Sequence, residues 1–273
     1  MTLPKLVPFI STASLIMCGC QTTVGDAIPM TAPPPNPPGG NPDTLVMNSN
    51  RSDEGTDSRV VVLVHGIFNT ADRFRKMRAD LEANGFTVFA PSLAPNNAWH
   101  GLPDLAEKLK AEIDANLGPE APFALVGFSM GGLVSRYYLQ ELGGHARCQS
   151  FVVISSPLRG TLTGYAYVGD GAKQMRFNSE FLTALDAPDS LARLDRIPLY
   201  AYHTPLDLMI IPAESSAWHL ATNRTFWVAA HPLMLWDDAV IAALVEDLET
   251  SLPTSSAGSP QVVANEPPGA PDS

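Results

Sequence analysis

The sequence of 273 residues contains only three cysteines, and two of them, Cys18 and Cys20, lie near the N-terminus. The third, Cys148, has no cysteine partner in the rest of the chain. A disulfide needs two cysteines, and a structural zinc site needs several ligands at short, regular spacing. The zinc-binding pattern H-E-x-x-H is also missing. We therefore expect no disulfide framework, no metal centre and no cofactor.

Basic residues are scarce as well. The chain has 17 Lys and Arg against 28 Asp and Glu, a formal net charge of −11. Apart from four at 73–78, the basic residues are spread along the chain. Binding to nucleic acid draws on clustered positive charge that neutralises phosphates. The acidic composition argues against a nucleic-acid partner, and we interpret the acidic excess as a contribution to solubility.

The first twenty residues have the features of an export signal. A positively charged start precedes an apolar stretch at 6–17, which is too short to span a bilayer as a stable anchor. A cysteine directly after such a core resembles the lipobox of bacterial lipoproteins, whose thiol is lipidated. Cys20 follows the small Gly19 and is the preferred site, and Cys18, with a leucine three residues before it, is the alternative. We expect an exported protein, either attached to the cell envelope through this lipid or secreted after cleavage nearby.

Proline, glycine, asparagine and serine dominate the segments on both sides of the central part of the chain. Residues 21–58 include the run Pro-Pro-Pro-Asn-Pro-Pro at 33–38, and residues 251–273 have a similar character. Such segments bury too little apolar surface to offset the entropy of the chain. We predict a signal at 1–20, a linker at 21–58, a tail at 251–273 and one globular domain at 59–250.

Within this domain, short apolar runs alternate with segments of helical periodicity. The expected strands are residues 59–64, 86–91, 121–126, 150–155, 197–202 and 224–229. The expected helices include residues 70–84, 102–117 and 236–248, and a further helix follows residue 129. This alternation predicts an α/β fold, a doubly wound, mostly parallel sheet of about six strands with helices on both faces. Active sites of such sheets lie at the carboxyl ends of the strands.

Residues 127–131 read Gly-Phe-Ser-Met-Gly and match G-x-S-x-G, the sharp turn that presents a nucleophilic serine between a strand and a helix. The apolar run at 121–126 and the helical spacing after the turn provide the context that this motif requires. Glycines on both flanks leave room where a side chain would collide with neighbouring elements. The motif predicts Ser129 as an activated nucleophile, and the alternative is a tight structural turn.

A serine hydroxyl needs an imidazole to accept its proton. His231 follows the last expected strand and precedes the final helix, which is where an elbow-type hydrolase carries its base. His203, at the end of the fifth strand, is the fallback base. His65, at the end of the first strand, is interpreted as a structural residue that braces the following loop.

The imidazole in turn needs a carboxylate to hold its tautomer. Asp207 lies shortly after the fifth strand between apolar neighbours, where an unpaired charge would be costly. A histidine partner would explain it, and a helix or turn cap is the alternative. Glu214 and Asp237 are the other candidate acids.

The negative oxygen of a tetrahedral intermediate needs fixed N–H donors. Met130, directly after the nucleophile at the start of a helix, supplies one. The loop after the first strand, with Gly66 allowing close approach of the backbone, supplies the second at Ile67.

Four motifs together resemble the α/β-hydrolase lipases of bacteria, most nearly the compact lidless ones. They are Val-His-Gly-Ile at 64–67, Gly-Phe-Ser-Met-Gly-Gly at 127–132, Asp-Leu-Met-Ile-Ile at 207–211 and His-Pro-Leu at 231–233. The resemblance covers about residues 59–250. It implies Ser129 as nucleophile, Asp207 as acid, His231 as base, and Ile67 and Met130 as oxyanion donors.

Two segments depart from the family pattern or add to it. Residues 156–161 are similar to the T-P-H-x-G-[ST] segment of many such lipases, with Leu158 in place of the histidine. Residues 160–196 form an insertion with an expected helix at 179–185, and it resembles the segment that covers the site in lidded relatives. The two interpretations of this insertion are a partial lid and a fixed cap packed on the sheet.

Apolar residues surround the expected site and suit an aliphatic acyl group; they are Ile67, Phe68, Leu158 and Leu233. The sequence predicts a serine ester hydrolase, a lipase or carboxylesterase, that acts on small-molecule or lipid esters through an acyl-enzyme. The same residues would serve an amidase, thioesterase, acyltransferase or polyester depolymerase. A non-catalytic binding protein tethered to the envelope is the remaining alternative.

Overall fold

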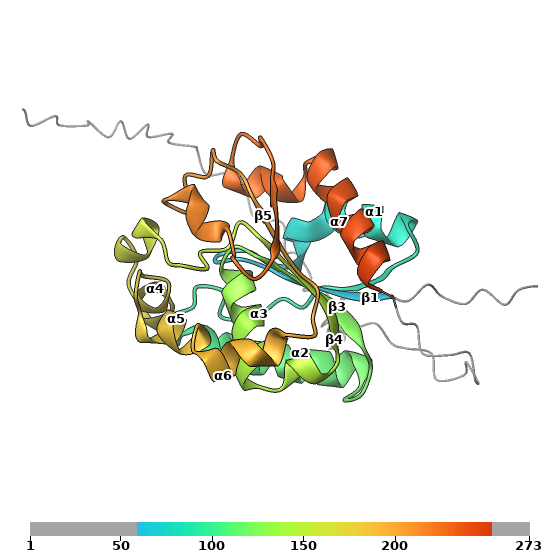
Figure 1. The fold of residues 1–273 in the computed structure, drawn as a ribbon, viewed down its shortest axis with the longest axis horizontal. Coiled ribbons are helices and arrows are strands. Elements are labelled where there is room, and N and C mark those ends of the chain that lie inside the picture. Colours follow the sequence, from blue (N-terminus) through green and yellow to red (C-terminus); the bar gives the residue numbers. More distant parts are fainter. Residues whose placement is uncertain (1–58, 253–273) are drawn as a thin grey trace, which may run out of the picture. The chain divides into compact units, whose positions relative to one another are not determined.

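The computed structural model describes residues 59–252. The predicted signal, the linker and the tail beyond residue 252 lie outside the described residues, as do Cys18 and Cys20. The described part contains a six-stranded sheet of order β2-β1-β3-β4-β5-β6 (Figure 1). Every neighbouring pair of strands is parallel. The predicted α/β architecture with a parallel sheet is confirmed.

The strands lie close to the predicted runs. Their bounds are β1 Val60–Val64, β2 Thr87–Phe89, β3 Phe123–Phe128, β4 Cys148–Ile154, β5 Leu199–His203 and β6 Thr222–Thr225. The four-residue β6 ends earlier than expected, because the apolar residues after it do not continue the strand. Phe226 instead packs its ring on Tyr202, with centroids 5.3 Å apart, and Val228 is buried.

Helices connect the strands in alternation. The α-helices are α1 Arg75–Ala83, α2 Leu102–Leu117, α3 Met130–Glu141, α4 Asp170–Gln174, α5 Glu180–Leu185, α6 Pro188–Leu191 and α7 Asp238–Ser251. Short 3₁₀ turns complete them, namely η1 Ala71–Phe74, η2 Gly144–Ala146, η3 Leu162–Tyr165, η4 Ala192–Leu194, η5 Ala213–Ser216 and η6 His231–Leu235. The helix expected over 70–84 is therefore split into η1 and α1. No helix within residues 59–252 has the length and apolar character needed to cross a bilayer.

Two apolar clusters cover the two faces of the sheet, as alternating side chains of β1 show. Val60, Val62 and Val64 pack with residues of α2 and α3. Val61 and Leu63 point the other way and pack with residues of α1 and α7. Figure 1 shows these helix pairs on opposite sides of the sheet. Strands buried on both faces explain the continuous apolar runs in the sequence.

The strand order changes direction between β1 and β3, because β2 lies on the far side of β1. The loops that leave two neighbouring strands at such a point diverge to opposite sides of the sheet and open a crevice. Here these loops begin at His65 and at Ser129. The sheet topology thus brings together two segments that are more than sixty residues apart in the chain.

Candidate active site

Ser129 occupies a sharp turn between the end of β3 and the start of α3. Its backbone has φ 55° and ψ −127°, a region that non-glycine residues rarely adopt. A Cβ atom on Gly127 would lie 2.5 Å from Gly132 Cα, and one on Gly131 would lie 2.2 Å from the carbonyl oxygen of Val64. The two glycines of the motif are therefore required by close backbone packing. This geometry is that of the predicted elbow.

Hydrogen bonds from β4 hold the elbow in place. The amide of Ser129 donates to the carbonyl of Ile154 at 2.9 Å. The hydroxyl of Ser156, which is fully buried, donates to the carbonyl of Ser129 at 2.7 Å. Ser156 has no predicted role in the sequence, although its position just after a strand next to the elbow strand was a usable signal.

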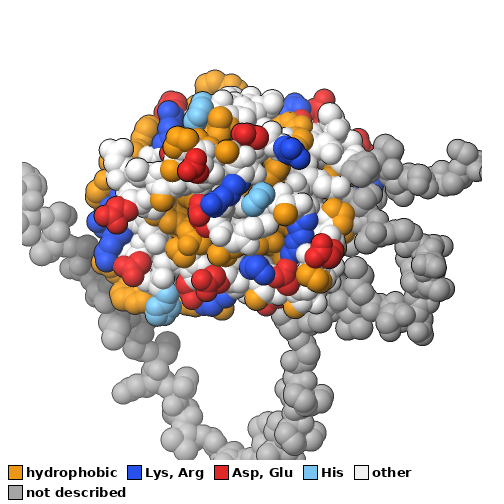
Figure 2. Space-filling view, turned by 60° about the horizontal axis from the view of Figure 1, so that its bottom comes forward, with side chains coloured by type: hydrophobic (Ala, Val, Ile, Leu, Met, Phe, Trp, Pro, Cys, Tyr) orange, Lys and Arg blue, Asp and Glu red, His pale blue; other side chains and the backbone are white. Residues whose placement is uncertain are grey.

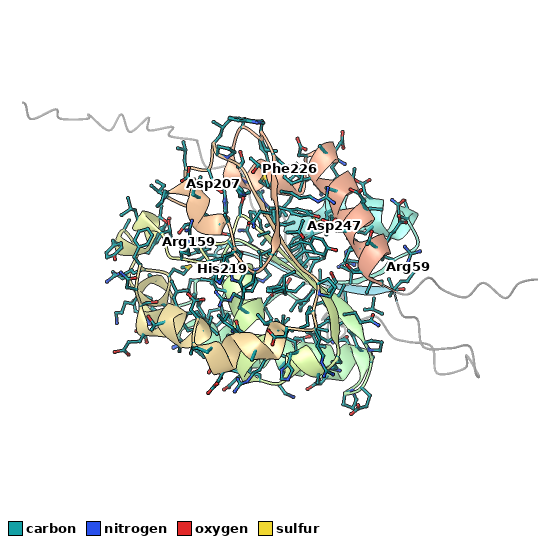
Figure 3. The ribbon with its side chains drawn as sticks, in the orientation of Figure 1. Arg59, Arg159, Asp207, His219, Phe226 and Asp247 are labelled. Atoms are coloured by element: carbon teal, nitrogen blue, oxygen red, sulfur yellow. The ribbon has the colours of Figure 1, made fainter. Side chains whose placement is uncertain are left out.

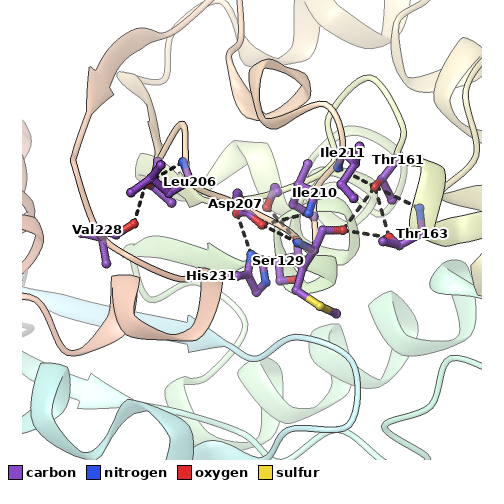
Figure 4. Close-up of polar contacts among 12 residues, drawn as sticks. Ser129, Thr161, Thr163, Leu206, Asp207, Ile210, Ile211, Val228 and His231 are labelled. Atoms are coloured by element: carbon purple, nitrogen blue, oxygen red, sulfur yellow. Dashed lines mark hydrogen bonds and ion pairs between the residues drawn. The ribbon is translucent and has the colours of Figure 1, made fainter.

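Asp207 and His231 meet in the structure as predicted from the sequence. Nδ1 of His231 lies 2.7 Å from Oδ2 of Asp207, and both residues are buried (Figure 4). The second oxygen of Asp207 accepts the amides of Met209 at 2.8 Å and Ile210 at 2.9 Å. Both oxygens of the carboxylate thus accept hydrogen bonds, one from the imidazole and the other from two amides of the loop that carries Asp207.

Opposing effects act on the pKa of Asp207. Burial by itself would raise this pKa. The hydrogen bond and the charge of His231, with the amides of Ile210 and Met209, outweigh burial and hold the pKa below its ordinary value. The carboxylate is therefore ionised at neutral pH and able to stabilise an imidazolium.

The imidazole of His231 lies beside the elbow. Its ring packs on Phe128, the residue before Ser129, with centroids 4.7 Å apart. Figure 4 shows Ser129, His231 and Asp207 in one cluster. Within the described chain, the Ser129 hydroxyl has no hydrogen-bonded partner.

The loop after β1 reaches Ser129 and carries a free amide. A Cβ on Gly66 would lie 2.9 Å from the Cβ of Ser129. Neither the amide of Ile67 nor that of Met130 donates a hydrogen bond to another residue in 59–252. Both residues line a small cleft with Ser129. Two unpaired N–H groups at one serine are the arrangement that binds an oxyanion.

His65 braces this loop. Its Nδ1 lies 2.9 Å from the carbonyl of Gly66, and its Nε2 accepts the amide of Leu93 at 2.9 Å. These bonds require the neutral ring with the proton on Nδ1, and burial lowers the pKa of His65 in agreement with that form. His65 is therefore a structural residue, as interpreted from the sequence.

The alternative acids and base lie in other surroundings. Nε2 of His203 is 3.3 Å from the hydroxyl of Thr225. Asp237 caps α7 by accepting the amides of Ala239 and Val240. Glu214 lies in η5 near His203 and forms no hydrogen bond with His231 among the described residues. Only Asp207 among these acids is bonded to the imidazole beside Ser129.

The cleft at Ser129 is narrow, with a volume of about 30 Å³. Its walls come from the loops after β1, β3, β4 and β5; they are Ile67, Ser129, Met130, Pro157, Thr161, Thr163, Gly164, Tyr167, Met175, Met209 and Ile210. Most of these side chains are apolar. The sequence singled out Ile67, Ser129 and Met130 among them, and it placed the insertion at the site without naming the residues of the insertion that line the cleft.

The three residues predicted to contact substrate differ in their exposure to solvent. Phe68 is 57% exposed, with its ring 5.8 Å from that of Tyr167, and Leu233 is 46% exposed. Leu158 is only 1% exposed and belongs to the core cluster of α2 and α3. The prediction that Leu158 contacts substrate is wrong for this structure, because the turn after Ser156 directs the side chain inward.

The start of the insertion is bonded to the loop that carries Asp207. The hydroxyl of Thr161, a buried residue, accepts the amide of Ile211 at 2.9 Å, and the hydroxyl of Thr163 donates to the carbonyl of Met209 at 2.8 Å (Figure 4). These bonds fix the wall of the cleft to the loop that carries the carboxylate of Asp207.

The middle of the insertion is bonded to α3. The buried guanidinium of Arg136 donates to the carbonyl of Leu185 at 3.1 Å and to the carboxylate of Asp186 at 2.8 Å. Gln140 donates to the same Leu185 carbonyl at 2.7 Å. Hydrogen bonds at both the start and the middle of the insertion favour the fixed cap over the partial lid.

No group of three metal-ligating side chains occurs among residues 59–252. Cys148 is buried without a disulfide, and burial raises the pKa of its thiol to about 12. A thiol of that pKa is a poor nucleophile.

Comparison with known proteins places this geometry in a wider group. Residues 59–239 match the family model described as "alpha/beta hydrolase fold". No curated protein matches the sequence. Several hundred solved chains resemble the structure, and three of them illustrate the range.

Lipase B of Aspergillus fumigatus has a TM-score of 0.57 at 17% identity, over 71% of this chain and 53% of that one. The chain thus spans about half the length of that lipase. The mature Bacillus licheniformis lipase BlEst2 has a TM-score of 0.54 at 15% identity, over 72% of this chain and 94% of that one. Polyneuridine aldehyde esterase has a TM-score of 0.51 at 19% identity, over 70% and 99% respectively. At these identities the likeness concerns the fold.

Proposed function

The chain belongs to the alpha/beta hydrolase fold family, and from this premise we propose that it is a serine ester hydrolase, a lipase or carboxylesterase that cleaves acyl or lipid esters through an acyl-enzyme. The observation that carries the proposal is the bond of 2.7 Å between His231 and Asp207 beside the strained Ser129. These three groups come from three separate segments of the chain, which follow β3, β5 and β6.

The first half of the proposed reaction forms the acyl-enzyme. Nδ1 of His231 is bound to Asp207, so Nε2 is the atom that accepts the proton of Ser129. The oxygen of Ser129 then attacks the ester carbonyl, and the amides of Ile67 and Met130 bind the resulting oxyanion. Nε2 returns the proton to the departing alcohol as the carbon–oxygen bond breaks.

The second half releases the acid. A water molecule gives its proton to His231 Nε2 and attacks the acyl carbon, and the oxyanion forms again at the same two amides. When the intermediate collapses, the proton passes to Ser129 and the carboxylic acid leaves. Asp207 stays ionised throughout and stabilises the imidazolium in both halves.

The walls of the cleft support an uncharged acyl group. Ile67, Met175, Met209 and Ile210 present apolar side chains beside Ser129. A charged acyl group would lose its hydration there without gaining a partner. The ester is therefore expected to carry an aliphatic acyl part.

Hydrolysis of p-nitrophenyl esters tests the proposal, with the matching p-nitroanilides as the comparison. We expect hydrolysis of the esters, much slower hydrolysis of the anilides, and loss of both in Ser129→Ala with an unchanged melting temperature. Faster turnover of the anilides would assign an amidase, which is the alternative that the same residues allow. No turnover of esters, thioesters or amides by the folded protein would favour a binding protein.

The place of the protein in the cell is a separate proposal that rests on the sequence alone. We propose export and lipidation at Cys20, with Cys18 as the alternative site. Metabolic labelling with a radioactive fatty acid tests it, because the label should be lost in Cys20→Ala. Retention of the label in that variant and its loss in Cys18→Ala would identify the other cysteine.

A further inference from the structure

Exposed apolar side chains gather at one edge of the sheet. Thirteen large hydrophobic residues are exposed between residues 59 and 252, and all except Leu220 lie in segments that follow the carboxyl ends of strands. We call these segments the rim loops; they are residues 65–70, 90–101, 155–169, 204–212 and 226–236. Single exposed apolar residues are ordinary, but a gathered set marks an interaction site.

The exposed set spans all five rim loops. It consists of Phe68, Trp99, Leu162, Tyr165, Tyr167, Val168, Leu206, Leu208, Met209, Trp227, Leu233 and Trp236. Leu208, Trp227 and Val168 are exposed by 79%, 78% and 75%, so a large part of their apolar area faces water. Such exposure is costly unless another surface covers it.

Contacts between three of the rim loops, at 65–70, 90–101 and 155–169, join their exposed apolar residues into one surface. The ring of Phe68 lies 5.8 Å from that of Tyr167. A Cβ on Gly169 would lie 3.3 Å from the Cα of Trp99. The loops at 65–70 and 90–101 therefore both adjoin the loop at 155–169.

The remaining two rim loops extend the same surface. The hydroxyl of Thr163 donates to the carbonyl of Met209, and the hydroxyl of Thr204 donates to the carbonyl of Val228 at 2.7 Å. These bonds join 155–169 to 204–212 and 204–212 to 226–236. Most residues lining the cleft at Ser129 belong to these loops, so the cleft lies within the apolar surface.

The rim loops are also nearly free of charge. Of the 17 basic and 28 acidic residues in the chain, they contain only Arg159 and Asp207 (Figure 3). Asp207 is buried against His231, and the guanidinium of Arg159 donates to the carbonyl of Glu214. In contrast, Figure 2 shows acidic and basic side chains scattered over the part of the molecule that it turns forward.

We infer that the rim loops are a docking surface for the face of a condensed, uncharged ester phase, such as a droplet of neutral lipid ester. An anionic bilayer would be attracted by several basic residues, and Arg159 is the one Lys or Arg in these loops. The apolar, uncharged surface of such a droplet matches the rim loops. Docking there would place the mouth of the cleft at Ser129 against the substrate. The inference rests on the proposed ester hydrolase function and adds the physical state of the substrate.

Binding is tested without turnover and without any attached lipid. The full chain carries Ser129→Ala to prevent hydrolysis, and Cys18→Ala with Cys20→Ala to prevent lipidation. Flotation measures its partition onto triolein droplets, onto phosphatidylcholine vesicles and onto phosphatidylglycerol vesicles. We expect the highest partition on triolein, unchanged between about 0.05 M and about 0.5 M NaCl, because screening acts on charges and not on apolar contact.

A rim variant and a matched control test the surface itself. Val168→Asp with Trp227→Asp replaces two highly exposed residues of different rim loops, neither of which lines the cleft. Leu220→Asp replaces the one exposed large hydrophobic residue outside the rim loops in the described chain. We expect the rim variant to lower the partition onto triolein by about tenfold or more, and the control to leave it unchanged.

Three results would overturn the inference. They are partition of the rim variant equal to that of its parent, an equal loss in Leu220→Asp, and preferential binding to the anionic vesicles that disappears with salt. Melting temperatures check that each variant is folded.

The docking surface and the proposed function can fail separately. With Ser129 restored, the rim variant should hydrolyse a dissolved short-chain ester at the parent rate. Hydrolysis of dissolved esters without binding to triolein would remove the docking surface and leave the function. Binding to triolein through the rim loops without hydrolysis of any ester would remove the proposed function and leave the docking surface.

Discussion

Gly66 and Ser129 are in contact across the edge of the sheet, since a Cβ on Gly66 would lie 2.9 Å from the Cβ of Ser129. This contact brings the amide of Ile67 to the elbow. The amide of Met130 is there already, because it directly follows Ser129 in the chain. A side chain at residue 66 would therefore disturb the proposed oxyanion site before it disturbed the core.

Two glycine substitutions separate activity from folding. Gly66→Ala meets side-chain atoms of Ser129 and Phe128, so we expect a fall in kcat of about 100-fold with a small change in melting temperature. Gly131→Ala meets the carbonyl oxygens of Val64 and His65 at 2.2 and 2.6 Å, and backbone cannot move aside. We expect it to lower the free energy of unfolding by about 3 kcal/mol. Equal effects of the two changes on kcat and on melting temperature would contradict this reading.

The hydroxyl of Ser156 supports the elbow through its bond to the carbonyl of Ser129. Ser156→Ala should lower the free energy of unfolding by about 1 kcal/mol, because the buried carbonyl of Ser129 loses one of its two donors and keeps only the amide of Gly132. Ser150→Ala is the control, since Ser150 is equally buried on β4 and its hydroxyl has no hydrogen-bond partner among the described residues. Urea unfolding of both variants measures the difference, and a loss at Ser150 as large as that at Ser156 would count against the role.

Leu158 is expected to act in the core and Tyr167 in the cleft. Leu158→Ala should cost about 2–5 kcal/mol of stability and leave the preference for acyl chain length unchanged. Tyr167→Ala should shift that preference with little change in melting temperature, because its side chain is 41% exposed. A series of p-nitrophenyl esters of increasing acyl length measures the preference. A shift caused by Leu158→Ala alone would restore the prediction from sequence.

The lowered pKa of Asp207 predicts a pH dependence of stability. The ionised carboxylate stabilises the folded chain fully above its ordinary pKa of 3.8, and this contribution is lost as the pH falls through the lower pKa of the folded state. The stability difference between the parent and Asp207→Asn should thus be largest near neutral pH and shrink below pH 3.8. Urea unfolding at several pH values measures this stability difference, and a difference that grows on acidification would contradict the prediction. At neutral pH the variant should also lose about 10⁴-fold in kcat.

Much of the fold was predictable because its signals are local. The apolar run that became β1, the periodicity of α2 and the elbow motif at Ser129 each reflect neighbours in the sequence. The place of His231 and Asp207 after strands was predictable for the same reason. The boundary of β6 was not, because an edge strand needs no apolar pattern, and Phe226 and Val228 after it pack on the core instead of continuing the strand.

The walls of the cleft depended on contacts between distant segments. Nothing in the spacing of residues 156–161 shows that Leu158 turns inward while Thr161 turns to the loop of Asp207. The anchoring of the insertion to Arg136 likewise joins residues about fifty positions apart. Such pairings follow from tertiary packing, which a single sequence does not display.

Labelling with a fluorophosphonate, followed by mass spectrometry of the tryptic peptides, is the sharpest test of whether Ser129 is an activated nucleophile. An activated serine reacts with this probe, whereas ordinary hydroxyls do not. We predict a single adduct on Ser129, greatly slowed in His231→Ala and absent in Ser129→Ala. A folded protein that takes up no probe, or one that keeps its adduct when Ser129 is replaced, would contradict the account.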